Sequence, residues 1–73
     1  MRMILPEQLQ QLRDEYPFGT RVELVYMDDV QAPPIGTLGT VIGVDDIGSI
    51  MVHWDDGSGL SVAWGADFCR RIE

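Results

Sequence analysis

The 73-residue chain has no lysine, one cysteine and one histidine, and each shortage excludes a class of function. A single cysteine, Cys69, cannot form an intrachain disulfide, which fits the reducing cytoplasm where we expect the protein to act. One cysteine and one histidine are too few for a zinc site, so we expect no metal and no cofactor. The glycines have neither a following helix nor a nearby lysine, so no phosphate-binding loop is predicted.

Long apolar runs are also missing. None approaches the ~20 residues that cross a bilayer, so no membrane partner is expected. The short apolar start of the chain meets Glu7 at once, which is not typical of a signal peptide. We therefore expect one small cytoplasmic domain that spans residues 1–73.

Negative charge is what the chain has in excess. Twelve acidic residues against five arginines give a net charge of −7. Such a surface repels phosphate backbones, so we expect no direct contact with nucleic acid. It can attract a basic protein surface, or it can simply keep a small domain soluble.

The hydrophobic pattern predicts one helix followed by strands. Residues 5–16 carry an apolar stripe at helical spacing, with Pro6 suited to the first helical position and Pro17 ending the segment. The stripe, which must dock on the rest of the chain or on a partner, consists of Leu5, Leu9, Leu12 and Tyr16.

The remainder reads as short strands separated by glycine and aspartate turns. Strands are predicted at residues 20–27, 38–45, 49–54, 59–64 and 68–72, with a single turn of 3₁₀ type at 65–67. This pattern is typical of a mainly β fold, a small five-stranded SH3-like barrel over residues 19–73 with the helix at its N-terminal side. Trp54 is expected in the core, and Phe18 and Phe68 are expected to pack at the barrel ends.

The motifs within residues 16–72 resemble a family of small domains of unknown function. They are Gly19-Thr20-Arg21-Val22, Ala32-Pro33-Pro34 and the run GTVIGVDDIGSIMVHWDDGS that begins at Gly39. The family occurs in Gram-positive bacteria, their phages and conjugative elements, and it offers no activity to transfer. A weaker similarity, through a Gly-Thr-Val strand and a Val-x-Trp-Asp-x-Gly-Ser hairpin, links the chain to SH3-like ligand-binding domains of ubiquitin ligases. That similarity implies the barrel fold and protein recognition by analogy.

Three aspartate pairs stand at strand ends: residues 28–29, 45–46 and 55–56. Aspartate at such positions usually accepts nearby backbone N–H groups and stops a strand from extending. The pairs can also present a surface to a basic partner. Their spacing is not that of a calcium-binding loop, so no metal site is predicted from them.

The exposed aromatics point to recognition more than to catalysis. By analogy with the SH3 groove, Tyr26 and Trp64 would lie together beside Asp28 and Asp29 and take a Pro- and Arg-containing peptide. The alternative is that Trp64 only closes one barrel end. A nucleophilic pair of Cys69 with the single histidine would lack an orienting third group, so we expect no enzyme.

These observations predict a non-enzymatic protein-binding module with an acidic and aromatic surface. The alternative is a phage or mobile-element anti-defence inhibitor, similar in action to anti-CRISPR proteins, that blocks the basic nucleic-acid-binding surface of a host protein. The partner is a protein in both cases, and the oligomeric state is left open. The predicted binding residues are Tyr26, Asp28, Asp29, Asp45, Asp46 and Trp64.

Overall fold

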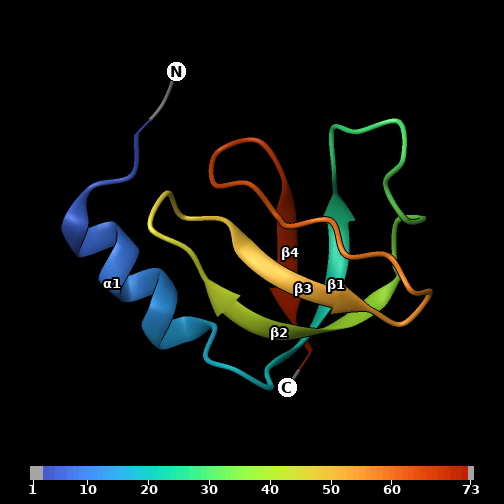
Figure 1. Ribbon diagram of the computed structural model, residues 1–73, viewed down its shortest axis with the longest axis horizontal. Helices are drawn as coiled ribbons and strands as arrows, with labels where there is room; N and C mark the ends of the chain where they lie inside the picture. Colours follow the sequence, from blue (N-terminus) through green and yellow to red (C-terminus); the bar gives the residue numbers. More distant parts are fainter. Residues whose placement is uncertain (1–2, 73) are drawn as a thin grey trace.

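A computed structural model describes residues 3–72, so the final residue of the predicted barrel, Glu73, and the first two residues of the chain lie outside the described part. One helix and four strands follow each other along the chain (Figure 1). The strands form one antiparallel sheet in the order β3-β2-β1-β4, which confirms the mainly β prediction. The elements are α1 (Pro6–Glu15), β1 (Arg21–Tyr26), β2 (Leu38–Val44), β3 (Ile50–Trp54) and β4 (Phe68–Arg71).

Helix α1 begins and ends within one residue of the prediction. Pro6 occupies the first turn, and the backbone N–H of Leu5 donates to Oε1 of Gln8 at 2.9 Å. The helix lies beside the sheet, and none of its residues is buried (Figure 1). Leu12 and Tyr16 nevertheless pack against the core, whereas Leu5 at the other end of the predicted stripe is 52% exposed, so only the C-terminal part of the stripe docks on the protein itself. No helix within residues 3–72 has the length and apolar character needed to cross a membrane.

The core is built by residues that alternate along the strands. Val22 and Leu24 of β1 and Trp54 of β3 have no exposed surface. The indole N–H of Trp54 donates to the carbonyl of Leu60 at 2.8 Å, so its one polar atom is satisfied. The predicted core position of Trp54 is confirmed. The other strand residues in the core are Val41, Ile50 and Val52.

The two phenylalanines were predicted wrongly. Phe18 is 80% exposed because it stands in the turn between α1 and β1. Phe68 is 55% exposed because its neighbour Cys69 is the residue that packs against the core.

The fifth strand, expected at residues 59–64, does not form. In this segment only Val62 pairs with β3, through two backbone hydrogen bonds with Ile50 of 2.9 and 2.8 Å. Side chains take other backbone groups of the segment: the indole of Trp54 binds the carbonyl of Leu60, and Asp67 accepts the N–H of Ala63 at 3.0 Å. Such local bonds compete with a strand ladder.

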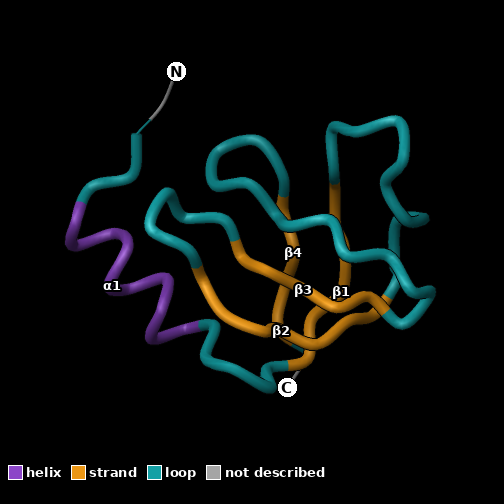
Figure 2. Tube along the Cα trace, in the orientation of Figure 1, coloured by secondary structure: helices purple, strands orange, loops and turns teal. Residues whose placement is uncertain are grey.

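The predicted barrel is therefore not the observed architecture. Strands β3 and β4 form opposite edges of an open, curved sheet, and residues 55–67 connect them as irregular chain (Figure 2). A turn at residues 64–66 precedes β4, with the N–H of Ala66 donating to the carbonyl of Ala63 at 3.1 Å. Residues at the C-terminal end of α1, residues of the irregular segment and residues of both edge strands line one common pocket.

Candidate functional site

The turn aspartates act as the sequence predicts. The carboxylate of Asp45 accepts the backbone N–H of Ile47 at 3.2 Å and of Ser49 at 2.8 Å. Asp29 and Asp56 each accept the N–H two residues further on, at 2.7 and 2.9 Å. These carboxylates hold turns in shape, which is the usual role of aspartate at strand ends.

Asp46 connects the β2–β3 turn to α1. Nη2 of Arg13 lies 2.8 Å from its carboxylate, and the guanidinium also donates to the carbonyl of Val44 at 3.4 Å. The Asp46 side chain is 96% exposed, so the ion pair itself contributes little stability. Both carboxylates of the predicted Asp45–Asp46 surface thus have partners within the protein. Asp45 binds the backbone of its own turn, and Asp46 binds Arg13 of α1.

Tyr26 is the last residue of β1 and has a partner on β4 that the sequence did not suggest. A register shift between Leu24 and Tyr26 leaves Tyr26 directly opposite Phe68 of β4. The two side chains are 48% and 55% exposed. Asp28 and Asp29 follow after the buried Met27 and are exposed, so this corner combines two aromatic side chains with two carboxylates. We call Tyr26, Asp28, Asp29 and Phe68 the acidic-aromatic edge.

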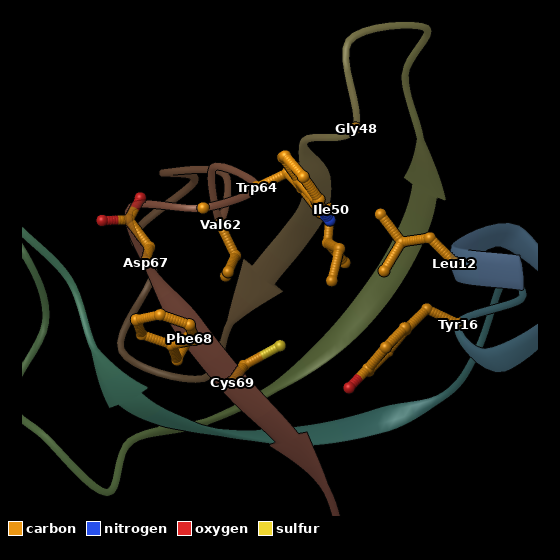
Figure 3. Close-up of a pocket in the computed structure, with 10 residues that line it drawn as sticks. Leu12, Tyr16, Gly48, Ile50, Val62, Trp64, Asp67, Phe68 and Cys69 are labelled. Atoms are coloured by element: carbon orange, nitrogen blue, oxygen red, sulfur yellow. The ribbon is translucent and has the colours of Figure 1, made fainter. Parts of the chain in front are cut away.

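Trp64 is placed elsewhere. It lines a pocket of about 310 Å³ between α1 and the two sheet edges, where Tyr16 faces it across the opening (Figure 3). Tyr26, Asp28 and Asp29 do not line this pocket, whereas Phe68 does. On its other side Trp64 lines a second pocket, of about 340 Å³, together with Asp46. Trp64 therefore lines both the pocket beside α1 and the pocket that contains Asp46. Phe68 lines the first of these pockets and also belongs to the acidic-aromatic edge.

Asp67 holds together two segments that lie near the pocket and the acidic-aromatic edge. One carboxylate oxygen accepts the backbone N–H of Asp28 at 2.9 Å, and the other accepts that of Ala63 at 3.0 Å. The residue thereby ties the loop after β1 to the segment before β4. Sequence reasoning missed a site role for both Asp67 and Phe68, and the only local signal was their position where the predicted turn at residues 65–67 meets the last predicted strand.

Burial makes two weakly acidic groups of the pocket, the Cys69 thiol and the Tyr16 hydroxyl, harder to ionise. Burial raises the pKa of the Cys69 thiol to about 11. The pKa of Tyr16 is also raised, first by burial and then by the charges of Cys69 and Glu15. Cys69 is therefore a protonated, packing thiol at neutral pH and not an activated nucleophile. His53 is exposed on β3, at the opposite sheet edge from Cys69 on β4, and among residues 3–72 no cluster of three His, Cys, Asp or Glu side chains could hold a metal ion.

The geometry defines a small, mainly β domain with one docked helix, an exposed acidic-aromatic edge and an adjoining pocket. The chain belongs to the family described as Domain of unknown function (DUF4314), whose model matches residues 5–72. This match confirms the resemblance to a domain family of unknown function. Neither the curated proteins nor the solved structures contain a match to the chain.

Proposed function

We propose that the protein is a non-enzymatic protein-binding module that recognises its partner through the acidic-aromatic edge. The observation that carries the proposal is the exposed cross-strand pair of Tyr26 and Phe68 beside Asp28 and Asp29. Aromatic side chains held on strands are rigid, so they lose little conformational freedom when a partner covers them. Tyrosine is also among the residues most enriched at binding hot spots.

The available area is sufficient for a specific anchor. About half of each aromatic side chain is exposed, and a fully buried aromatic side chain removes 150–250 Å² from water, so a partner could cover roughly 200 Å² on the pair. At about 25 cal/mol per Å² this corresponds to ~5 kcal/mol before the costs of association. The neighbouring carboxylates would select a partner with a basic surface.

A matched pair of variants tests the proposal. Tagged wild-type protein, Phe68→Ser and Phe18→Ser are used to capture partners from host lysate, with mass spectrometry as the readout. Both phenylalanines are exposed, but only Phe68 belongs to the edge. We expect a partner that wild type and Phe18→Ser retain and Phe68→Ser loses. A partner retained equally by all three proteins, or no partner at all, would refute the use of this edge.

The second candidate function is an anti-defence inhibitor that occupies the basic nucleic-acid groove of a host protein. The net charge of −7 and the exposed carboxylates of Asp28 and Asp29 support it. Binding should then weaken steeply as salt rises, and DNA or RNA should displace the protein from its partner. Charge reversal at Asp28 and Asp29 should cost more affinity than reversal at Asp14 and Glu15. Binding that is insensitive to salt would exclude this function.

A further inference from the structure

The pocket beside Trp64 has the walls of a site for an organic cation. Three aromatic side chains line it, and aliphatic side chains from α1 and β3 complete it (Figure 3). Its volume of about 310 Å³ lies at the lower end of the range for ligand pockets, ~300–1,000 Å³, which suits one side chain. We call it the aromatic pocket; its principal walls are Leu12, Tyr16, Ile50, Trp64, Phe68 and Cys69.

The charges around the pocket favour a positive guest. Asp67 is the one carboxylate in its lining, and neither arginine nor histidine lines it. The carboxylate of Asp67 is turned away from the centre of the pocket towards the backbone N–H groups that it accepts (Figure 3). It therefore adds negative potential without a direct contact. An anion would meet this potential together with a chain of net charge −7.

Two further charges lie near Tyr16, at the helix side of the pocket. Glu15 raises the pKa of Tyr16 and Arg71 lowers it, with the effect of Glu15 the larger. Arg71 is a cation that would oppose a positive guest, so its removal should strengthen the binding of that guest.

We propose that the aromatic pocket receives the side chain of a lysine or arginine from a basic protein partner. The aliphatic stem of the guest packs on Leu12 and Ile50, and its charged end lies against the rings of Trp64 and Tyr16, as long basic side chains do at amphipathic sites. Phe68 belongs to both the pocket and the acidic-aromatic edge, so the guest adjoins the proposed interface. The inference rests on the proposed function and names the chemistry of its partner.

The direct test uses two probes of nearly equal shape. N-acetyl-lysine methylamide and its norleucine analogue are titrated into ¹⁵N-labelled protein, and shifts of the Trp64 indole and of the Gly48 and Cys69 amides are followed. We expect the lysine probe to bind roughly 3- to 30-fold more tightly than the norleucine probe, the range of a cation–aromatic contact. Equal or tighter binding of norleucine, or no shift with either probe at its solubility limit, would overturn the proposal.

Variants assign the effect to the pocket. Trp64→Leu keeps an apolar wall and should abolish the preference for lysine, while Arg71→Gln should strengthen lysine binding and leave norleucine binding unchanged. Phe68→Leu provides a second aromatic deletion at a position that is 55% exposed, should Trp64→Leu fold poorly. Lysine selectivity that persists in both deletions would also overturn the proposal.

The test is separable from that of the proposed function. If Phe68→Ser loses its protein partner while Trp64→Leu keeps that partner at full affinity, the module binds through the edge and the pocket inference is wrong. If the lysine preference is found but no partner depends on the edge, the proposed function fails and the pocket remains a cation site.

Discussion

Substitution of Gly39 by alanine should be among the most damaging single changes in the chain. Gly39 is buried in β2, opposite Trp54 in the register with β3. A Cβ added there would lie 2.6 Å from Cγ1 of Val52 and 2.7 Å from Cε3 of Trp54, closer than real Cβ atoms approach other atoms. Both neighbours are fully buried and cannot move aside without disturbing the core.

The expected cost follows from overpacking. Added methyl groups in well-packed cores cost ~1–3 kcal/mol, and two clashes against buried side chains place Gly39→Ala at about 3 kcal/mol. A chain of this length has a total stability of ~4–11 kcal/mol, so the loss is a large fraction of the whole. The midpoint of thermal unfolding should fall by roughly 12–24 °C, measured by circular dichroism.

Gly59→Ala is the matched control. No atom lies within 4 Å of a Cβ placed at Gly59, and its φ is not in the left-handed region. This variant should be neutral or stabilised by ~0.4–1 kcal/mol through the unfolded state. A Gly39→Ala protein within about 0.5 kcal/mol of wild type, the range of neutral surface changes, would refute the packing of Trp54 on β2.

Three other changes should have smaller effects. Asp67→Ala leaves two backbone N–H groups without their acceptor and should cost ~1–3 kcal/mol in urea unfolding, whereas an unchanged midpoint would show that water replaces it. Burial raises the pKa of Cys69 from 9.0 to about 11, so its contribution to stability is complete below pH 9 and lost towards pH 11; thiol reagents should react slowly at pH 8 until urea is added, and rapid native reaction would contradict its burial. Arg13→Gln should speed hydrogen exchange in α1 while global stability changes by less than ~1 kcal/mol, and unchanged exchange would mean that the contact with Asp46 does not hold the helix.

The regular elements could be predicted because their signals are local. The leucine spacing with Pro6 and Pro17 defines α1, and alternation defines β1 and β3. The role of aspartate in the turns was equally predictable, since one carboxylate of each pair, that of Asp29, Asp45 or Asp56, binds backbone within its own turn.

The missing strand and the pocket depend on side-chain contacts that the alternation of apolar and polar residues within one segment does not record. Residues 59–64 alternate like a strand, but the acceptor for the Trp54 indole and the donor to Asp67 both come from this segment, which a local pattern cannot reveal. Trp64 was predicted beside Tyr26. It instead lines a pocket with Leu12 and Tyr16, at the C-terminal end of α1. The bulge that sets Tyr26 against Phe68 likewise requires the register of β4.

The positions of Trp54 and Trp64 give the protein two built-in optical reporters. The indole of Trp54 is sealed in the core and should emit at short wavelength until the sheet itself unfolds. Trp64 is half-buried beside α1 and should respond when the helix detaches or the pocket fills. In a Trp54→Phe protein, whose one tryptophan is Trp64, a fluorescence transition that coincides with the far-UV circular dichroism transition of the same protein would mean that helix and sheet unfold as one unit, and an earlier fluorescence transition would mean that α1 separates first.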